Sequence, residues 1–338
     1  MPKMKFLQIG LGSMGKRRIR CLLHNGIDKS QIFGFDPLAT RRKETEEKYG
    51  IKTYKDFQAA FNEVNPDALI ISTPPNLHHE YFLFAAKHKK HFFVEATIID
   101  KGYKELEKLL DNSFVAAPSC TFRYFPAVKK IKELITNNEI GKVLSFNYHL
   151  GLYLPDWHPW EDYRKVYFSK KETGGAREMF VFELVWLVDI LRSKPIKVGG
   201  FVDKVSDLDM PADDVYSAVL QFDNNIIGNI AVDVLARAPF RTLRIIGSEG
   251  VLNWEWMDYE IKLYRAKDKK WKIIKLKEGE KKKYDFIAEG TYREEIKYFL
   301  DAIAGKKKYP YTFQEDYQIL QTLHALEKSS KTNKFISL

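Results

Sequence analysis

The chain has 338 residues, of which 45% are hydrophobic and 14% aromatic, and its formal net charge is +10. This length favours two domains over one, and the apolar content is sufficient for packed cores, which excludes a disordered chain. No apolar run reaches the roughly 20 residues of a membrane span. Cys21 and Cys120 are too few for a disulfide framework or a cysteine-based zinc site.

The positive charge includes two lysine runs, at residues 281–283 and 306–308. No nucleic-acid-binding motif accompanies them, so we interpret them as solvated surface and expect no nucleic-acid partner. A positive field would also suit an anionic substrate such as a nucleotide-sugar. The N-terminus enters a strand at once and leaves no room for a signal peptide, so we expect a cytoplasmic protein without a membrane partner.

A short apolar strand at residues 5–9 runs into a glycine-rich turn and then into a helix at 14–25. Gly10, Gly12 and Gly15 have the G-x-G-x-x-G spacing, which allows a tight turn, close approach of a pyrophosphate and packing of the helix on the strand. The first N–H groups of the helix and its dipole would bind the phosphates. This turn therefore predicts a dinucleotide site made by Gly10, Leu11, Gly12, Ser13, Met14 and Gly15.

A second strand, at residues 31–36, ends in Asp36. An acid at this point, about 20 residues after the glycines, is expected to bind the ribose 2′-hydroxyl of NAD. Arg41 and Arg42 follow in a predicted helix, where they are either ordinary surface charges or acceptors for the 2′-phosphate of NADP. We therefore expect NAD as the cofactor, with NADP left open.

Four more strands complete a six-stranded, doubly wound parallel sheet, because apolar runs alternate with helical patterns. We expect strands near 53 and at 67–73, 91–96 and 114–117, with helices at 39–49, 56–63, 77–89 and 103–110. Ligands bind at the carboxyl ends of strands in such sheets. The further cofactor-binding candidates, at or just beyond these ends, are Thr73, Pro74, Asn76, His78, Glu95 and Ala96, together with Arg41 in the helix after Asp36.

The pattern changes after residue 120. A linking helix at 121–137 leads to a strand at 142–150, an aromatic loop at 154–172 and an apolar helix at 178–191. Short alternating strands with turns between them then predict a largely antiparallel sheet. These strands are expected near 196–203, 215–222, 226–235, 241–247, 251–256, 259–266 and 271–276, with closing helices at 292–304 and 313–329. We expect a Rossmann domain at 1–120 and an α+β domain at 121–338, whose last helices could pack back on the first.

The arrangement resembles the glucose–fructose oxidoreductase / inositol dehydrogenase (Gfo/Idh/MocA) family over almost the whole length. The resemblance implies a nicotinamide cofactor in the N-terminal domain and a sugar-like substrate between the domains. It also implies a homodimer or homotetramer formed through the open face of the C-terminal sheet. The matching pieces are Gly10-Leu-Gly-Ser-Met-Gly15, Asp36, Thr73-Pro-Pro-Asn-Leu-His78, Val94-Glu95, Gly174-Gly175 and Gly247-Ser-Glu-Gly250.

The chain departs from this family at its catalytic positions. The family places a Lys-Pro pair after the acid that corresponds to Glu95, whereas this chain has Ala96 and Thr97. The family's helical Asp and His fall on Met179 and Glu183. The chain thus looks like a divergent subgroup that replaced its catalytic groups together, while Glu95 is expected to keep its place near the nicotinamide ribose.

Interconversion of an alcohol and a ketone needs a side chain that takes or gives the hydroxyl proton. His158 is one candidate, because it lies in a loop at 153–163 whose aromatic rings could stack on a sugar. The alternative is an aromatic plug over the edge of the sheet, with His158 satisfied by a neighbour. The substrate-binding candidates in this loop are Trp157, Trp160 and Tyr163.

Glu183 is the second proton-handling candidate, because it lies on an almost entirely apolar helix where a carboxylate must find partners or raise its pKa. Glu178 and Arg177 on the same helix are candidates for binding substrate, as is Arg123. The alternative for both glutamates is a structural ion pair with Arg177 or Arg123. No His, Asp or Glu spacing indicates a metal site.

Together these patterns predict an NAD(P)-dependent oxidoreductase acting on a sugar derivative, most plausibly a nucleotide-sugar or another anionic sugar. Two alternatives remain open. The loss of the family's Lys, Asp and His would fit a cofactor-binding sensor or partner subunit that no longer performs the reaction. A conjugated acceptor in place of a sugar would keep the hydride chemistry and need little side-chain proton transfer.

Overall fold

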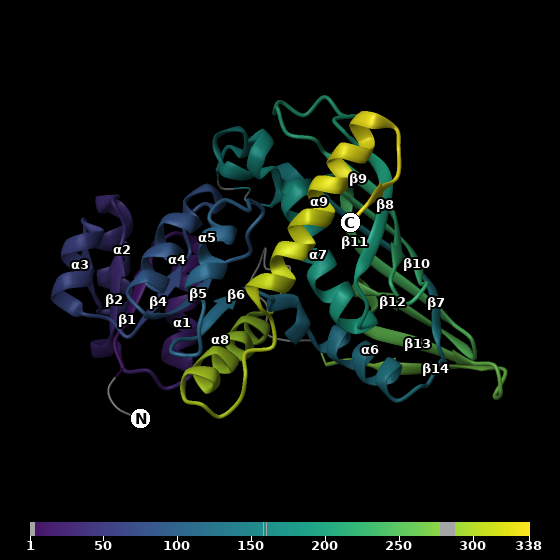
Figure 1. Ribbon diagram of the computed structural model, residues 1–338, viewed down its shortest axis with the longest axis horizontal. Coiled ribbons are helices and arrows are strands. Elements are labelled where there is room, and N and C mark those ends of the chain that lie inside the picture. The colour runs from purple at the N-terminus through teal and green to yellow at the C-terminus, as the bar shows by residue number, and fades with distance from the viewer. Residues whose placement is uncertain (1–3, 158, 160, 278–287) are drawn as a thin grey trace. The chain divides into compact units, whose positions relative to one another are not determined.

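The structure is a computed structural model that describes residues 4–157, 159, 161–277 and 288–338 (Figure 1). It divides into two compact units, which we describe separately. Unit 1 comprises Met1–Thr121 and Glu289–Tyr317, and unit 2 comprises Phe122–Ala288 and Gln318–Leu338. Of the helices in the described ranges, none combines the length and the apolar character that crossing a membrane requires.

Unit 1 is built on six parallel strands in the order β3-β2-β1-β4-β5-β6, which confirms the doubly wound sheet expected from the sequence. The strands are β1 (Phe6–Ile9), β2 (Ile32–Phe35), β3 (Lys52–Tyr54), β4 (Ala68–Ile71), β5 (His91–Val94) and β6 (Ala116–Pro118). The helices are α1 (Ser13–His24), α2 (Ala39–Tyr49), α3 (Phe57–Val64), α4 (His78–Lys87), α5 (Tyr103–Leu109) and α8 (Glu289–Ile303). Helix α9 (Phe313–Thr332) begins in unit 1 and continues in unit 2.

The central strands β1, β4 and β5 are buried on both faces, which explains their continuous apolar runs. Phe92 and Phe93 are neighbours on β5 and therefore point to opposite faces of the sheet. The ring of Phe92 stacks on Phe82 of α4 at 6.5 Å, whereas Phe93 packs against Phe299 of α8 at 5.9 Å. The order of the strands reverses between β1 and β4, so the carboxyl ends of these two strands mark the expected ligand edge.

Unit 2 is built on nine strands in the order β14-β13-β12-β11-β7-β10-β9-β8-β15. The sheet is antiparallel, as expected, except that β10 and β7 pair in parallel. The strands are β7 (Val143–Tyr153), β8 (Pro195–Asp203), β9 (Val215–Phe222), β10 (Ile227–Asp233), β11 (Leu235–Gly247), β12 (Gly250–Glu255), β13 (Glu260–Arg265), β14 (Lys270–Lys275) and β15 (Ile336–Ser337). The sequence did not predict the two-residue β15, which lies outside any apolar run.

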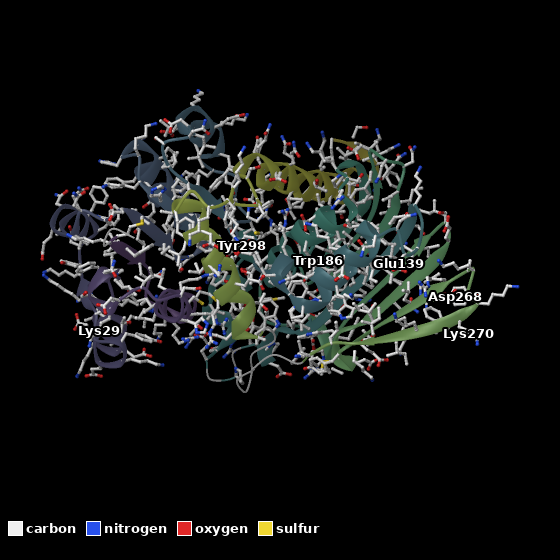
Figure 2. All side chains as sticks on the ribbon, turned by 90° about the horizontal axis from the view of Figure 1, so that it is seen from below. Lys29, Glu139, Trp186, Asp268, Lys270 and Tyr298 are labelled. Atoms are coloured by element: carbon white, nitrogen blue, oxygen red, sulfur yellow. The ribbon has the colours of Figure 1, made fainter. Side chains whose placement is uncertain are left out.

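Helices α6 (Pro126–Thr136) and α7 (Gly175–Leu191) belong to unit 2, and α7 is buried nearly all round, as its apolar sequence predicts. It begins three residues earlier than expected. A Cβ on Gly175, its first residue, would lie 3.0 Å from the ring of Trp157, so the glycine allows this ring to pack closely on the helix start. Figure 2 shows the buried Trp186 among the side chains of this interior, whereas Asp268 and Lys270 lie at the tip of the β13–β14 hairpin.

The two faces of the unit 2 sheet differ in character. Tyr148, on one face, is buried with α7, while its neighbour His149 points to the other face and is partly exposed. We call the face that carries Tyr148 the inner face and the one that carries His149 the outer face. The inner face holds the core of unit 2, and the outer face lacks a covering helix among the described residues of this unit.

Candidate functional site

The glycine turn after β1 has the geometry that its spacing predicts. Gly10 has a φ of +84°, and a Cβ there would lie 2.5 Å from the carbonyl oxygen of Ser72 at the end of β4. A Cβ on Gly15 would lie 1.9 Å from the carbonyl oxygen of Gly10. A Cβ on Gly12, in contrast, would meet only the guanidinium of Arg41, at 3.8 Å. The first and last glycines therefore allow close backbone packing, whereas Gly12 borders space that a ligand can use.

The start of α1 is suited to bind an anion. Gly12 is its N-cap residue, no side chain caps the helix, and its first turn contains no acidic residue. The first N–H groups of a helix lack partners within the helix and carry partial positive charge. The open space beside Gly12 and the uncapped N–H groups together fit the diphosphate of a dinucleotide.

Asp36 joins the end of β2 to the glycine turn. One carboxylate oxygen accepts a hydrogen bond from the N–H of Leu11 at 2.9 Å, and the other accepts one from Leu38 at 2.9 Å. The guanidinium of Arg41 lies 3.5 Å from the same carboxylate. Each oxygen can accept a further hydrogen bond, so this acid can hold the turn and still receive a ribose hydroxyl.

The loop after β4 brings further predicted residues to this edge. The hydroxyl oxygen of Thr73 is buried and has no hydrogen-bond partner among the described residues. An unpaired buried hydroxyl is costly, which fits a position that a ligand completes. Ser13, Pro74 and Asn76 are exposed, and Met14 and Ala96 are partly exposed.

His78 is buried and hydrogen-bonded to protein atoms, whereas histidines on helices are commonly exposed to solvent. Its Nε2 lies 2.8 Å from the carbonyl oxygen of Thr73, and its Nδ1 lies 3.2 Å from the hydroxyl of Thr97. Burial lowers the pKa of His78 to about 4. The neutral imidazole therefore links the loop after β4 to the segment after β5, next to Ala96.

Glu95 is fixed by an arginine that the sequence analysis did not single out. Arg18 of α1 donates to both of its oxygens, at 2.6 and 2.8 Å, and Ser72 donates to one of them at 3.2 Å. The third nitrogen of Arg18 donates to Glu295 of α8 at 2.7 Å. Burial opposes the charge of Arg18, but Glu95 and Glu295 outweigh this effect and raise the pKa of the guanidinium. The only sequence signal for this network was a lone arginine on the sheet-facing side of an amphipathic helix.

Glu183 is fully buried in unit 2, and both of its oxygens are occupied. Arg241 of β11 donates to Oε1 at 2.6 Å, while Tyr148 and Trp186 donate to Oε2 at 2.5 and 2.6 Å. The alternative considered for Glu183, a structural ion pair, is present, but its cation is Arg241 in place of Arg177 or Arg123. Protein donors thus occupy both oxygens of Glu183, so neither is left open to exchange a proton with a substrate hydroxyl.

Arg177 and Arg123 have other partners in unit 2. Arg177 donates to Glu327 at 2.6 Å, and Arg123 lies 3.4 Å from Asp189. Glu178 accepts a hydrogen bond from the hydroxyl of Tyr167 at 3.1 Å. The structure therefore places both arginines in ion pairs within the fold.

The aromatic loop is described only in part. His158 and Trp160 lie outside the described residues. Trp157 packs against Phe168 at 5.4 Å, and its buried Nε1 has no hydrogen-bond partner in the described ranges. The hydroxyl of Tyr163 accepts a hydrogen bond from the N–H of Asp209 at 3.1 Å.

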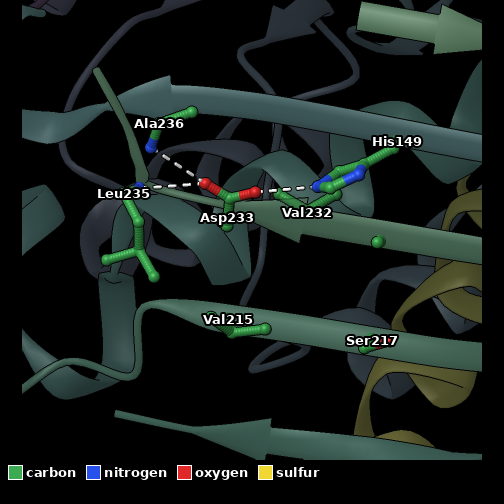
Figure 3. A pocket seen from close by; sticks show the side chains of 8 residues that line it. His149, Val215, Ser217, Val232, Asp233, Leu235 and Ala236 are labelled. Carbon is green, nitrogen blue, oxygen red and sulfur yellow. Dashed lines mark hydrogen bonds and ion pairs between the residues drawn. The ribbon is translucent and has the colours of Figure 1, made fainter. Parts of the chain in front are cut away.

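A pocket of about 320 Å³ lies on the outer face of unit 2 (Figure 3). His149 and Asp233 form a pair in it at 2.8 Å, and Asp233 also accepts hydrogen bonds from the N–H groups of Leu235 and Ala236. Nothing in the sequence indicates this pair, because its members lie 84 residues apart. No group of three or more His, Cys, Asp or Glu side chains in the described part of the chain could hold a metal ion.

Comparison with family models identifies both halves of the chain. Residues 4–112 match a model described as "Oxidoreductase family, NAD-binding Rossmann fold", and residues 128–253 match one described as "GFO/IDH/MocA C-terminal domain". The glycine turn, Asp36 and Glu95 lie within the first match. The matched model describes an NAD-binding fold. The open space beside Gly12 and the uncapped start of α1 fit NAD as the cofactor.

Two curated relatives are similar over part of their length. A myo-inositol 2-dehydrogenase from Thermotoga maritima is 30% identical over 142 residues, which are 40% of this chain and 41% of the relative. A levoglucosan dehydrogenase from Pseudarthrobacter phenanthrenivorans is 23% identical over 258 residues, which are 67% of this chain and 65% of the relative. The matches thus span less than two thirds of either relative.

Solved structures show the same fold over the full chain. An oxidoreductase from Agrobacterium radiobacter in complex with NAD⁺, L-tartaric acid and magnesium superposes with a TM-score of 0.88 at 14% identity, covering 99% of this chain and 98% of that one. A levoglucosan dehydrogenase in complex with NADH and L-sorbose superposes with a TM-score of 0.84 at 17% identity, with the same coverage.

Replacing Gly12 with alanine should weaken NAD binding without unfolding the protein. The added Cβ enters the space beside the helix start but contacts no backbone atom. We expect at least about tenfold weaker binding, or ~1.4 kcal/mol, by calorimetry. The matched variant Gly15→Ala should instead lose about 1–3 kcal/mol of unfolding free energy, because its Cβ meets the carbonyl oxygen of Gly10. Equal NAD affinity in Gly12→Ala and the wild type would contradict the assignment.

His78 should make the free energy of unfolding depend on pH. Its pKa is about 4 in the folded chain and 6.5 in the unfolded one, so between these values the unfolded state binds more protons. Its contribution is fully present above pH 6.5 and decreases as the pH falls towards 4, by up to about 3 kcal/mol. The free energy of unfolding, measured by urea unfolding at several pH values in this range, should depend less on pH in His78→Gln than in the wild type. The exposed His88 provides the control His88→Gln, which should keep the wild-type dependence on pH.

Proposed function

The chain belongs to the Gfo/Idh/MocA family, and we propose that it is an NAD-dependent oxidoreductase acting on a CH–OH group of a sugar derivative. The observation that carries this proposal is the uncapped start of α1, with open space at Gly12, next to Asp36. The curated relatives named above are dehydrogenases of a cyclic polyol and of an anhydrosugar, which supports a sugar-type substrate.

The bound nicotinamide would supply the hydride acceptor or donor, and the residues of unit 1 would bind and orient the cofactor. The N–H groups at the start of α1 would hold the diphosphate, and Asp36 would accept a ribose hydroxyl. Glu95, fixed from behind by Arg18, would present its partly exposed edge to the nicotinamide ribose. Arg41 lies near Gly12 and would be the residue to accept the 2′-phosphate if NADP is used.

The proton of the substrate hydroxyl needs a group other than the side chain after Glu95, because Ala96 cannot transfer one. We propose His158 for this role. Glu183, which the sequence analysis also considered, would act as a charged carboxylate that fixes Arg241. Trp157, Trp160 and Tyr163 would stack on the sugar, and Arg177, Glu178 and Arg123 would shape the binding region through their partners in the fold.

We propose further that the substrate is a nucleotide-sugar or another anionic sugar. The net charge of +10 supports it, since a positive field attracts anionic substrates. We also place the protein in the cytoplasm, where the free thiols of Cys21 and Cys120 would remain reduced.

A second candidate function rests on one observation. Ala96 provides no titratable group next to Glu95, and Glu183 has both oxygens occupied. A cofactor-binding sensor or partner subunit would need neither. Protein purified with bound NAD whose redox state does not change with any sugar would favour this alternative.

His158→Ala should separate catalysis from cofactor binding. If His158 handles the proton, its loss should lower kcat by about 100-fold or more while the Kd for NAD stays unchanged. The measurement is the absorbance of reduced nicotinamide in the presence of a panel of nucleotide-sugars, sugars and polyols, together with calorimetry of NAD binding. Wild-type turnover in His158→Ala would exclude this residue as the proton-handling group.

We further propose that the outer face of unit 2 binds a second copy of the chain. Phe201 is 70% exposed, Ile227 54% and Val219 40%, and they lie on the neighbouring strands β8, β10 and β9. Contiguous exposed apolar residues on a sheet face mark interaction sites, and a two-fold dimer would cover the same face in both copies. The pocket at His149 lies on this face as well.

The double variant Val219→Glu/Ile227→Glu should shift the protein towards the monomer, because burial of two added carboxylates is unfavourable. Sedimentation velocity measures the change. The control Leu110→Glu places a charge on a comparably exposed apolar residue of unit 1 and should leave the assembly intact. A wild-type protein that sediments as a monomer at all concentrations would contradict this proposal.

A further inference from the structure

Arg241 is a buried cation with one donor nitrogen left over. It is 3% exposed, and its Nε donates to the hydroxyl of Tyr148 at 2.9 Å while Nη2 donates to Glu183 at 2.6 Å. Nη1 is buried and has no hydrogen-bond partner among the described residues. Leaving a buried, charged donor unpaired costs more than the ~1–3 kcal/mol of a neutral one, so this nitrogen requires an explanation.

The guanidinium is held in place and cannot easily turn towards another partner. The rings of Phe122 and Trp256 lie 4.3 and 4.8 Å from its central carbon. Glu183, which anchors Nη2, is itself held by Tyr148 and by Trp186 at 2.6 Å. Nη1 is therefore a donor with a fixed position, as a ligand-binding group needs to be.

The charge of this cluster is already balanced. Burial opposes the charged form of Arg241, but Glu183 outweighs it, and the pKa of the guanidinium is raised. Burial and the charge of Glu183 raise the pKa of Tyr148, whose phenol is therefore neutral. One guanidinium and one carboxylate sum to zero. A second carboxylate at Nη1 would leave an uncompensated buried negative charge, whereas a hydroxyl or carbonyl oxygen would not.

A second unpaired donor lies beside the first residue of α7, the helix that carries Glu183. The buried Nε1 of Trp157 has no partner in the described ranges, and its ring packs at Gly175, the first residue of α7. Glu183, which holds Arg241, lies eight residues further on, or about 12 Å along the helix axis. Two buried donors of unit 2 without a partner in the described ranges suit a ligand with several oxygen acceptors and no charge at these points.

We infer that Nη1 of Arg241 donates a hydrogen bond to a neutral oxygen of the substrate sugar, so that the protein discriminates against a carboxylate at that position. This inference rests on the proposed function and narrows it. The negative charge of an anionic substrate would have to lie away from Arg241, as it does in a nucleotide-sugar, whose charge is on the diphosphate and whose sugar ring is neutral. A sugar acid is excluded at this position.

Two matched pairs of probes test the inference on the wild-type protein loaded with NAD. UDP-glucose and UDP-glucuronate differ only at one carbon of the sugar, as do D-glucose and D-glucuronate. Calorimetry should show at least about tenfold tighter binding of the neutral member of a pair. Tighter binding of either acid, or no binding of any of the four probes, would overturn the inference.

Arg241→Lys then tests the residue itself. Lysine keeps the positive charge beside Glu183 but lacks the planar fork that provides Nη1. We expect the Kd or KM of the neutral probe to rise at least about tenfold, while the Kd for NAD, which unit 1 binds, stays near the wild-type value. Arg265→Lys is the matched control, because Arg265 pairs with Glu139 and Asp268 elsewhere in unit 2. Unchanged affinity for the neutral probe in folded Arg241→Lys would overturn the inference.

The two proposals fail in different ways. If the sugars bind but reduced nicotinamide never changes, the proposed oxidoreductase function fails, and the ratio of neutral to acidic affinities still decides the role of Arg241. If turnover occurs with equal or better use of the acid, the function stands and the inference fails. Should Arg241→Lys not fold, the probe pairs on the wild-type protein remain decisive.

Discussion

The ion pair between Arg18 and Glu95 organises the cofactor edge of unit 1. The two-point contact, at 2.6 and 2.8 Å, joins the helix that follows the glycine turn to the carboxyl end of β5. The third nitrogen extends the contact to Glu295 on α8, whose carboxylate also accepts the N–H of Cys120 after β6. A bidentate pair fixes orientation as well as distance. The start of α1 and the edge of Glu95 therefore keep one geometry relative to each other, and such a preorganised site lowers the cost of ordering a flexible dinucleotide.

The fold was largely predictable because its signals are local. The glycine spacing, the apolar runs and the alternation of strand and helix patterns depend on residues close in sequence, and they gave six parallel strands and the elements of the second sheet. The parallel pairing of β10 with β7 was not predictable in this way, since it brings Ile227 beside Ser145 across a long stretch of chain. Hydrophobic alternation specifies which face of a strand is buried, but not which strand is its neighbour.

The candidate site was predictable where it depends on backbone or on a residue at the end of a strand, as at Asp36 and Glu95. Gly10, Gly12 and Gly15 are identified by what their missing Cβ atoms allow. The partner of Glu183 could not be found in this way, because Arg241 lies 58 residues further along the chain and nothing in its own segment distinguishes it from a surface arginine. The sequence did show that a carboxylate on the buried face of α7 needs a partner, but not which cation provides it.

The two buried arginines, Arg18 and Arg241, differ in how many of their nitrogens donate a hydrogen bond to the protein. Arg18 faces two carboxylates, and each of its three nitrogens donates to a protein atom, so its network is closed and serves the fold. Arg241 faces one carboxylate, and one of its nitrogens has no partner in the described part of the chain. Both side chains are buried cations. The difference lies in the remaining donor, because a fold that only needed to neutralise Glu183 would have no use for a nitrogen it leaves unpaired, whereas a binding site does.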